Sequence, residues 1–263
     1  MTHAPRKRFG QHFLADSAVL AAIIDAIAPR AGDRLVEIGP GLGALTQALL
    51  ERVPSIDAVE IDRDLVERLR QRFGPRLALH SADALAFDFA LLARPGEKLR
   101  LVGNLPYNIS SPLLVRLLDF LPVIEDQHFM LQKEVVARIA AAPGSADYGR
   151  LTVMLQAHHE VESLFDVPPQ AFEPPPRVDS AVLRMIPLQR PRCEDRAALH
   201  SVLMVAFGQR RKMLRNTLLP WLAERRVDVG ALPAPLAPTA RPEQIDVDVY
   251  CELARRVAKA SRL

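Results

Sequence analysis

Between residues 34 and 132, short apolar runs alternate with segments of helical periodicity. The runs predict strands at 34–39, 56–61, 77–80, 99–103 and 128–132, and the periodic segments predict helices at 44–52, 64–73 and 111–120. Such alternation implies a mostly parallel sheet with helices on both faces, an α/β fold. Because these sheets bind ligands at the carboxyl ends of their strands, the functional residues are expected directly after the strands.

The segments on either side of this alternation predict three parts of the chain. Residues 1–15 are expected to form an extended arm, and Asp16 with Ser17 can cap a following helix. A further strand is predicted at 179–186. Pro187 and Pro191 then indicate a domain boundary, and helices are predicted at 196–207, 210–219 and 247–260. We therefore expect an arm (1–15), an α/β domain (16–189) and a small helical domain (190–263).

Composition excludes several classes of protein. The apolar runs are far shorter than the roughly 20 residues of a membrane span, and residues 1–13 lack the apolar core of a secretory signal. A cytoplasmic protein is therefore expected. Two isolated cysteines and scattered histidines predict no disulfide framework and no metal site. Residues 190–263 hold 14 Lys and Arg against 8 Asp and Glu, which makes the helical domain the candidate surface for a polyanion.

A glycine-rich loop follows the first predicted strand, in the run Val36-Glu37-Ile38-Gly39-Pro40-Gly41-Leu42-Gly43. Glycine lets the backbone turn sharply and approach a ligand closely. The spacing is G-x-G-x-G, and the form G-x-G-x-x-G is met only with Ala44 in the last place. By itself the loop fits a nicotinamide-dependent dehydrogenase as well as any other nucleotide-binding enzyme.

Acidic residues follow the next two predicted strands. Glu60 lies 21 residues after Gly39, where a carboxylate can accept hydrogen bonds from both hydroxyls of a ribose. Asp83 follows the third strand, where it can accept from an amino group such as adenine N6; a helix cap is its alternative role. Asp62 is a second candidate for the ribose, but its place beyond the strand end favours solvation at the surface. The three strand ends thus carry glycines, an acidic residue for a ribose and an acidic residue for an adenine. Together they indicate a binding site for a nucleoside without a pyrophosphate, which fits S-adenosylmethionine.

After the fourth strand stands Asn104-Leu105-Pro106-Tyr107, which resembles the Asn/Asp-Pro-Pro-Tyr signature of amino-methylating enzymes; a plain turn is its alternative interpretation. An aryl amine is a poor nucleophile because its lone pair is delocalised into the ring. The side-chain oxygen of Asn104 and the carbonyl of Leu105, exposed by the turn at Pro106, can accept from its two hydrogens and free that lone pair. Tyr107 can stack on the base. The pattern indicates direct methyl transfer in which positioning supplies most of the catalysis.

Several segments resemble the ribosomal RNA adenine dimethyltransferase family, most closely its bacterial small-subunit members, over about residues 6–260. The matching segments are Lys7–Leu14, Val36–Gly41, Asn104–Ser110, Phe129–Glu134, Tyr148–Leu151, Pro174–Ser180 and Ala206–Lys212. The resemblance implies a Rossmann-like methyltransferase sheet of seven strands. It implies transfer of methyl groups from S-adenosylmethionine, giving S-adenosylhomocysteine, without a metal.

The resemblance also implies the substrate. It is two adjacent adenosines in a hairpin loop near the 3′ end of 16S ribosomal RNA, converted to N6,N6-dimethyladenosine in the immature small (30S) subunit. Extruding a base costs a few kcal/mol, and it costs least where the base is already unpaired, as in a hairpin loop. The expected protein is a monomer that acts in ribosome biogenesis and has no membrane partner.

The same resemblance implies which residues contact the target base, the RNA phosphates and the cofactor. Phe129 is expected to sandwich the target base opposite Tyr107, with a buried strand position as its alternative. Basic residues on the predicted helix at 210–219 are expected to contact RNA phosphates, with a solvated surface as the alternative: Arg210, Arg211, Lys212 and Arg215. The cofactor is expected to contact His12, Leu14, Glu37, Gly39, Gly41, Glu60, Asp83 and Asn104. His12 stands where many relatives carry asparagine.

Three other functions remain open at this point. A ribosome-assembly or transcription factor could keep the fold for binding alone, although binding needs neither Glu60 and Asp83 nor the run Asn104–Tyr107. An enzyme acting on large-subunit RNA to confer antibiotic resistance would share most motifs. A nicotinamide-dependent dehydrogenase is the most distant alternative.

Overall fold

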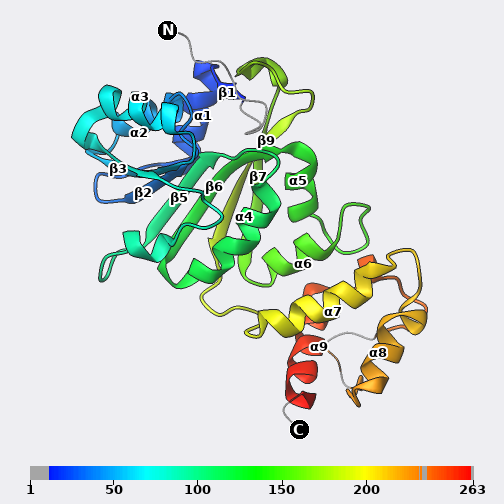
Figure 1. The fold of residues 1–263 in the computed structure, drawn as a ribbon. Coiled ribbons are helices and arrows are strands. Elements are labelled where there is room, and N and C mark those ends of the chain that lie inside the picture. The colour runs from blue at the N-terminus through cyan, green and yellow to red at the C-terminus, as the bar shows by residue number, and fades with distance from the viewer. Residues whose placement is uncertain (1–11, 231, 233–235, 262–263) are drawn as a thin grey trace. The chain divides into compact units, whose positions relative to one another are not determined.

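A computed structural model describes residues 12–230, 232 and 236–261 (Figure 1). Of the predicted arm, only residues 12–15 fall within this range. The chain divides into two compact units, unit 1 with Met1–Val136 and Glu162–Ile186, and unit 2 with Ala137–Val161 and Pro187–Leu263. Residues 137–161, which the sequence analysis assigns to the α/β domain, group with the C-terminal residues.

Unit 1 is built on a seven-stranded sheet in the order β4-β3-β2-β5-β6-β9-β7 (Figure 1). Neighbouring strands from β4 to β6 are parallel, and β9 is antiparallel to β6. The mostly parallel, seven-stranded α/β fold is thereby confirmed. The strands of this sheet are β2 (Arg34–Ile38), β3 (Ile56–Glu60), β4 (Leu77–Ser81), β5 (Leu99–Asn104), β6 (Ile124–Gln132), β7 (His159–Val167) and β9 (Ser180–Pro187).

A second, two-stranded sheet joins the start of the described chain to the segment before β9. In it β1 (Phe13–Leu14) pairs antiparallel with β8 (Phe172–Glu173). The backbone N–H groups of Ala15 and Asp16 also donate to the carbonyl of Ala171, at 2.8 and 3.2 Å. Residues 12–16 are thus held against residues 171–174, far away in the sequence.

The predicted helices of unit 1 are all present, one of them with an early ending. They are α1 (Ser17–Ile27), α2 (Ala44–Leu50), α3 (Arg63–Phe73) and α4 (Ser110–Leu117). Helix α5 (Lys133–Ile139), whose start belongs to unit 1, is an additional helix that the sequence analysis did not predict. The predicted cap of α1 is confirmed, since Asp16 Oδ1 accepts from the N–H groups of Ala18 and Val19. The helix predicted at 111–120 ends at Leu117 and continues as a 3₁₀ helix that contains Pro122, which lacks the N–H an α-helix needs.

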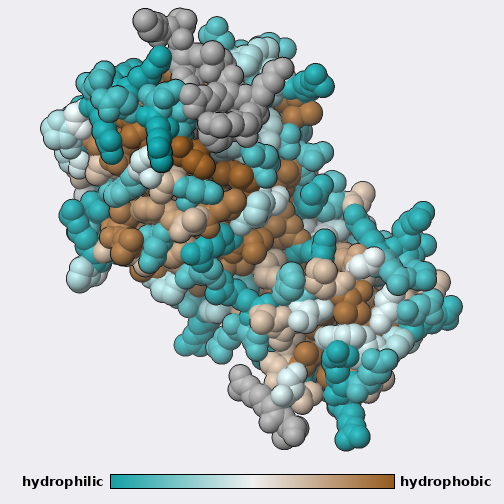
Figure 2. All heavy atoms as spheres, in the orientation of Figure 1, coloured by the Kyte–Doolittle hydropathy of each residue, from teal (hydrophilic) through white to brown (hydrophobic). Residues whose placement is uncertain are grey.

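The main core of unit 1 packs α1 and α2 against the central strands. Ile27 and Leu49 on these helices, and Leu35 and Ala58 on β2 and β3, are almost completely buried. Figure 2 shows apolar residues (brown) gathered on the viewed face of this unit, with hydrophilic residues (teal) around them. Nearly all residues of β2, β3 and β5 are buried, as expected for a parallel sheet covered on both faces.

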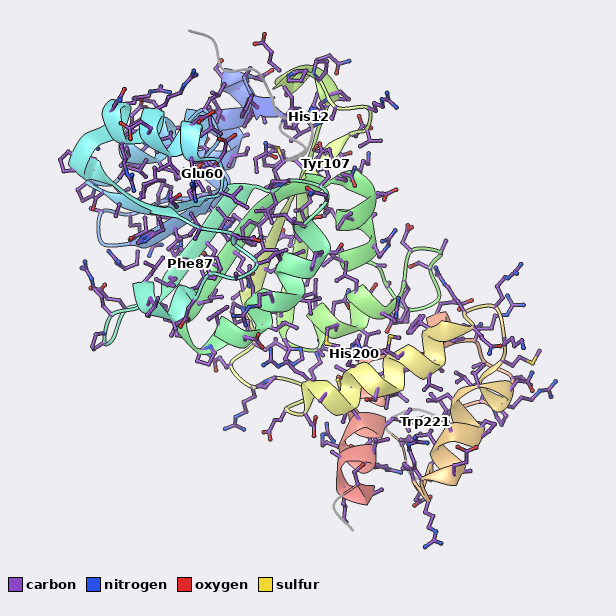
Figure 3. The ribbon with its side chains drawn as sticks, in the orientation of Figure 1. His12, Glu60, Phe87, Tyr107, His200 and Trp221 are labelled. Atoms are coloured by element: carbon purple, nitrogen blue, oxygen red, sulfur yellow. The ribbon has the colours of Figure 1, made fainter. Side chains whose placement is uncertain are left out.

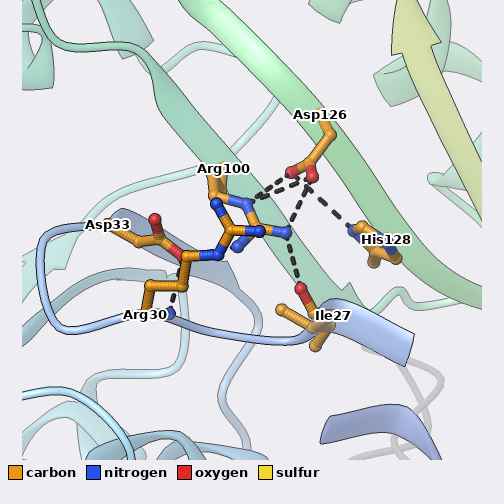
Figure 4. Close-up of polar contacts among 6 residues, drawn as sticks. All are labelled: Ile27, Arg30, Asp33, Arg100, Asp126 and His128. Carbon is orange, nitrogen blue, oxygen red and sulfur yellow. Dashed lines mark hydrogen bonds and ion pairs between the residues drawn. The ribbon is translucent and has the colours of Figure 1, made fainter. Parts of the chain in front are cut away.

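A buried ionic network stands at the amino ends of the central strands (Figure 4). The guanidinium of Arg100 in β5 donates to both carboxylate oxygens of Asp126 in β6, to Asp33 and to the carbonyl of Ile27. Burial lowers the pKa of Arg100, but Asp126 and Asp33 together raise it above its ordinary value, so the guanidinium stays charged. The network fixes the sheet at the edge opposite to the ends that carry the predicted site.

Unit 2 is helical and comprises α6 (Arg150–Gln156), α7 (Arg196–Gly208), α8 (Leu218–Glu224) and α9 (Val247–Ala260). Figure 3 marks α7 by His200 and α8 by Trp221. Its core holds the fully buried rings of Tyr148 and Tyr250, whose hydroxyls donate to the carbonyls of Ile245 and Pro242, both at 2.8 Å. Within the described part of the chain, no helix is long and apolar enough to cross a membrane.

The helix predicted at 210–219 is wrong. Helix α7 ends at Gly208, and the N–H of Lys212 donates to the carbonyl of Gln209 at 2.8 Å in a turn. A short 3₁₀ helix, Leu214–Asn216, precedes α8. Gly208 favours this ending, because the glycine backbone loses more conformational entropy in a helix than that of any other residue, and Gln209 after it has left the helical conformation. Arg210, Arg211 and Lys212 therefore stand on a turn and not on a helix face.

Candidate active site

The carboxyl ends of the central strands open onto a cavity of about 230 Å³. It lies within unit 1, and Figure 3 shows His12, Tyr107 and Glu60 at this edge of the sheet. Every predicted catalytic and cofactor residue except Phe129 lines it. These residues are His12, Leu14, Glu37, Gly39, Gly41, Glu60, Asp83, Asn104, Leu105, Pro106 and Tyr107. Side chains that follow four different strands thus meet at one place, as the parallel topology predicts.

The glycine loop crosses one side of the cavity in a conformation that needs glycine. Gly41 has a φ of +59°, and a Cβ there would lie 3.1 Å from the ring of Phe13. Its N–H donates to Glu60 Oε2 at 3.3 Å. This amide is therefore directed at a carboxylate of the protein, whereas a dinucleotide fold uses such amides for a pyrophosphate.

Two carboxylates stand buried beside the cavity. Glu37 accepts a hydrogen bond from Thr46 Oγ1 at 2.5 Å, and Glu60 accepts from the N–H of Asp62 at 2.8 Å. Burial raises the pKa of Glu37 to about 7, against the effect of the Thr46 hydrogen bond and helped by the charge of Glu60. Burial likewise raises the pKa of Glu60, against its backbone hydrogen bonds. Two desolvated carboxylates favour a ligand that brings positive charge and hydroxyl donors.

The basic side chains around the cavity are few. Among the described residues that line it there is no Lys or Arg, and the imidazoles are those of His12 and His128. Burial lowers the pKa of His128, so its ring is neutral at physiological pH. An anionic pyrophosphate would meet carboxylates here without a compensating cation. The cavity therefore fits a cationic nucleoside such as S-adenosylmethionine better than a dinucleotide.

The two aspartates near the cavity differ from each other. Asp83 is exposed at the cavity wall, and its Oδ1 accepts from the N–H of Leu85 at 2.9 Å, so it forms a local turn while facing the cavity. Asp62 was expected to be solvated, but it is 1% exposed and caps α3 through the N–H of Asp64. The cap buries Asp62 because the helix starts directly after the strand end.

The acceptor loop, residues 104–108, is held by bonds to other parts of unit 1. Asn104 Nδ2 donates to the carbonyl of His12 at 2.9 Å, and the N–H of Leu105 donates to the carbonyl of Met130 at 3.1 Å. The hydroxyl of Tyr107 shares a hydrogen bond of 2.8 Å with Ser180 Oγ. Because the amide nitrogen of Asn104 is used by His12, its Oδ1 is the atom presented to an incoming donor.

Phe129 is the predicted site residue that the structure does not bring to the cavity. Its side chain is 0% exposed in β6, while its neighbours His128 and Met130 line the cavity. Successive side chains of a strand point to opposite faces, so Phe129 faces the other side of the sheet. Its alternative interpretation, a buried strand residue, describes it in this structure.

Other cavity residues were not identified from the sequence. They include Ile61, Ala82, Ala84, His128, Met130 and Val182. Ser180 was quoted only as part of the run Pro174–Ser180, without a role. The position of Ile61 directly after Glu60, and of Ala82 and Ala84 around Asp83, could have indicated them, whereas nothing local marks His128 or Val182.

The predicted RNA-binding residues belong to unit 2 and are exposed: Arg210, Arg211, Lys212 and Arg215. Arg210 donates to the carbonyl of Ala146 and lies 4.0 Å from a carboxylate oxygen of Glu243. Hydrophilic residues cover much of the α8 end of this unit in Figure 2. In the described ranges, no three His, Cys, Asp or Glu side chains gather so that they could hold a metal ion.

Comparison with known proteins places the chain among close relatives. Residues 2–258 match the family model described as ribosomal RNA adenine dimethylase. A protein of Cupriavidus necator named ribosomal RNA small subunit methyltransferase A is 56% identical over 264 residues, which cover 97% of this chain and 93% of that protein. A protein of Bordetella petrii with the same name is 57% identical over 261 residues, covering 98% and 97% of the two chains.

Two solved structures share both the fold and part of the sequence. A dimethyladenosine transferase from Plasmodium falciparum superposes with a TM-score of 0.78 at 25% identity, covering 95% of this chain and 98% of that one. The 23S rRNA methyltransferase ErmE superposes with a TM-score of 0.70 at 28% identity, covering 94% and 99%. Because each similarity covers nearly the whole length of both chains, it extends to both units.

Proposed function

Because this chain belongs to the ribosomal RNA adenine dimethylase family, we propose that it methylates adenines of ribosomal RNA with S-adenosylmethionine as methyl donor. The observation that carries the proposal is the meeting of Glu37, Glu60 and Asn104 around one cavity. It combines a binding place for a cationic nucleoside with an acceptor for an aryl amine. The product formed from the donor is S-adenosylhomocysteine.

Different residues of the cavity recognise different parts of the cofactor. Glu60 accepts hydrogen bonds from the ribose hydroxyls, and Asp83 accepts one from the adenine amino group. Glu37 supplies negative charge beside the positively charged part of the molecule. The loop Gly39–Gly41 and the residues His12 and Leu14 line the same cavity and would contact the cofactor there. When bound, S-adenosylmethionine supplies an electrophilic methyl group, so the protein needs no metal for this chemistry.

The acceptor loop prepares the target nitrogen for attack. Asn104 Oδ1 and the carbonyl of Leu105 accept hydrogen bonds from the two N6 hydrogens of the target adenine. These bonds pull the nitrogen toward tetrahedral geometry and localise its lone pair. The ring of Tyr107 would stack on the base and so orient its amino group for attack. The N6–C bond would form as the S–C bond of the donor breaks, and the methylated nitrogen would then lose a proton to water. Because this proton leaves after the attack, no strong general base is needed. In the second transfer one N6 hydrogen remains, so only one of the two acceptors is used.

The finer substrate assignment rests on the relatives. Proteins named for the small ribosomal subunit are 54–57% identical to this chain, and the structure named for 23S rRNA is 28% identical. This difference favours small-subunit RNA over the large-subunit alternative. We infer that the substrate is the pair of adjacent adenosines in the 3′ hairpin loop of 16S ribosomal RNA, dimethylated at N6 in the immature 30S subunit by a cytoplasmic monomer.

Unit 2 is the proposed RNA-binding surface. Arg211, Lys212 and Arg215 are exposed in and after the turn that follows α7. Residues 190–263 carry 14 Lys and Arg against 8 Asp and Glu. Exposed cations on one unit would bind the phosphate backbone while unit 1 performs the chemistry. A protein that only bound RNA would not need the buried carboxylates of unit 1, which argues against a non-catalytic assembly factor.

The test is methyl transfer to small subunits isolated without this modification. Purified protein with S-adenosylmethionine labelled in its methyl group should label the RNA, and mass spectrometry of the 3′ hairpin should find N6,N6-dimethyladenosine at two adjacent positions. Asn104→Ala should lower the rate on the order of 100-fold or more, because a preorganised hydrogen-bonding group is lost. Calorimetry should show whether the variant still binds the cofactor.

Gln71→Ala is the matched control, because Gln71 is an exposed amide on α3. It should keep the wild-type rate. Wild-type activity in Asn104→Ala would remove the proposed role of this residue. Absence of label with the wild-type protein on subunits that another dimethyltransferase modifies would exclude the proposed function.

A further inference from the structure

Residues outside the acceptor loop hold its aromatic ring in place. Tyr107 comes directly after Pro106 on a loop that is partly exposed, and a tyrosine side chain in such a place has several rotamers open to it. Here the hydroxyl shares a hydrogen bond of 2.8 Å with Ser180 Oγ. Ser180 lies 73 residues further along the chain and is 0% exposed at the start of β9.

Ser180 has a fixed position of its own. It pairs with Gln132 across the antiparallel ladder between β6 and β9, and the N–H of Lys133 donates to the carbonyl of Asp179 at 2.9 Å. The hydroxyl of Ser180 therefore starts from a rigid strand. A bond from a rigid, buried partner restricts a mobile ring far more than a bond to solvent does.

His12 restricts the same ring from a second direction. Its imidazole stacks on the ring of Tyr107 at a centroid separation of 5.8 Å and an angle of 26° (Figure 3). Nδ1 of His12 lies 2.8 Å from the carbonyl of Pro174, on the segment that leads to Ser180. Tyr107 is thus held at its hydroxyl by Ser180 and on one ring face by His12. These two residues belong to segments 12–16 and 171–180, which are themselves paired through β1 and β8.

We propose that Ser180 is a positioning residue of the methyltransferase: its hydroxyl fixes the ring of Tyr107 in the orientation in which the target base stacks on it. The inference rests on the proposed function. Because the hydroxyl of Tyr107 is engaged by Ser180, Tyr107 acts through its ring and not as an acid or a base. Ser180 is not among the residues that line the cavity, so its effect on the reaction should pass through Tyr107.

A double-mutant cycle between Ser180→Ala and Tyr107→Phe tests the proposal. Each variant deletes the same hydrogen bond and keeps the ring, so each should lower kcat by about 3- to 10-fold, the range of one hydrogen bond. The double variant should be no slower than either single variant. The dissociation constant of S-adenosylmethionine should stay unchanged, because the loss concerns the acceptor side. Ser201→Ala, an exposed hydroxyl on α7, should leave kcat unchanged.

A second measurement does not depend on turnover. The chain has three tyrosines, so isotope-labelled tyrosine gives few NMR signals, and Tyr107→Phe assigns that of Tyr107. In the wild-type protein the hydroxyl proton of Tyr107 should exchange slowly with water, and in Ser180→Ala this protection should disappear. The signals of Tyr148 and Tyr250 should not change.

The two measurements separate the possible failures. If the wild-type chain methylates RNA and the effects of the two substitutions multiply, Ser180 acts by another route and the positioning role is overturned. If the wild-type chain transfers no methyl group, the proposed function fails, and the NMR protection still decides whether Ser180 fixes Tyr107. An unprotected hydroxyl in the wild-type protein would overturn the proposal in either case.

Discussion

At the scale of single residues, the most informative group is the carboxyl of Glu37. It is 1% exposed, and burial raises its pKa from the ordinary value of 4.5 to about 7. Between these two values the native state binds more protons than the unfolded state. The free energy of unfolding therefore falls as the pH rises through this window. A buried carboxylate that lowers stability at neutral pH is what the proposed positively charged ligand would require beside it.

Glu37→Gln should remove this pH dependence. The amide can still accept a hydrogen bond from Thr46 Oγ1 but carries no charge. Relative to the wild-type protein, the variant should gain free energy of unfolding between about pH 5 and about pH 8, by on the order of 1–3 kcal/mol. Urea denaturation without cofactor measures the difference. Glu67→Gln, an exposed carboxyl on α3, should show no such trend, and an equally flat difference for Glu37→Gln would contradict the assignment.

At the scale of elements, the acceptor loop depends on how closely β2 and β5 approach each other. Gly103 is the residue before Asn104, and a Cβ added to it would lie 2.4 Å from the carbonyl oxygen of Ile38. Ile38 in turn precedes the glycine loop. The missing side chain therefore sets the spacing between the strand that carries the cofactor loop and the strand that carries the acceptor loop.

Gly103→Ala should force these two strands apart. Because the clashing atom belongs to the backbone, relief requires movement of a strand, and we expect a loss of about 1–3 kcal/mol in the free energy of unfolding. Affinity for S-adenosylmethionine should fall as well, which calorimetry can measure. Gly32→Ala is the control, since nothing lies within 4 Å of a Cβ at that position. Equal stability of the two variants would show that the strands do not set this spacing.

At the scale of the whole molecule, the proposed function assigns chemistry and RNA binding to different units. The cavity lies entirely in unit 1, whereas the exposed basic turn after α7 lies in unit 2. Binding through phosphates depends on salt, because each contact releases counterions. The salt dependence of RNA affinity therefore reports on unit 2 separately from catalysis.

Arg211→Ala and Lys212→Ala should weaken RNA binding. Each substitution should reduce the slope of log affinity against log salt concentration by about 1, because one phosphate contact is lost. Arg210 is less suitable, because it already contacts Ala146 and Glu243. Filter binding over a range of salt concentrations measures the slope, and cofactor affinity should stay unchanged. Arg68→Ala on α3 is the control and should leave the slope unchanged. An equally unchanged slope in both Arg211→Ala and Lys212→Ala would show that RNA binds to another surface.

The sequence by itself determined the α/β class, the succession of strands β2 to β6 and helices α2 to α4 along the chain, and most of the residues that line the cavity. These features have local causes: apolar periodicity, helix caps, glycines that need positive φ, and polar residues placed at strand ends. Parallel topology then brings those ends together without further information. The cavity therefore contains all the predicted cofactor residues and four of the five predicted catalytic ones.

Only the tertiary structure decided the remainder. Strand β6 is buried on both faces, so no alternation in its sequence could tell that His128 and Met130 line the cavity while Phe129 does not. The apolar residues of the short helices α5 and α6 and of the partly exposed strand β7 show no clear periodicity, so these elements were not predicted. The bond between Tyr107 and Ser180 joins residues 73 positions apart. Such contacts depend on strand register and packing, which no local pattern encodes.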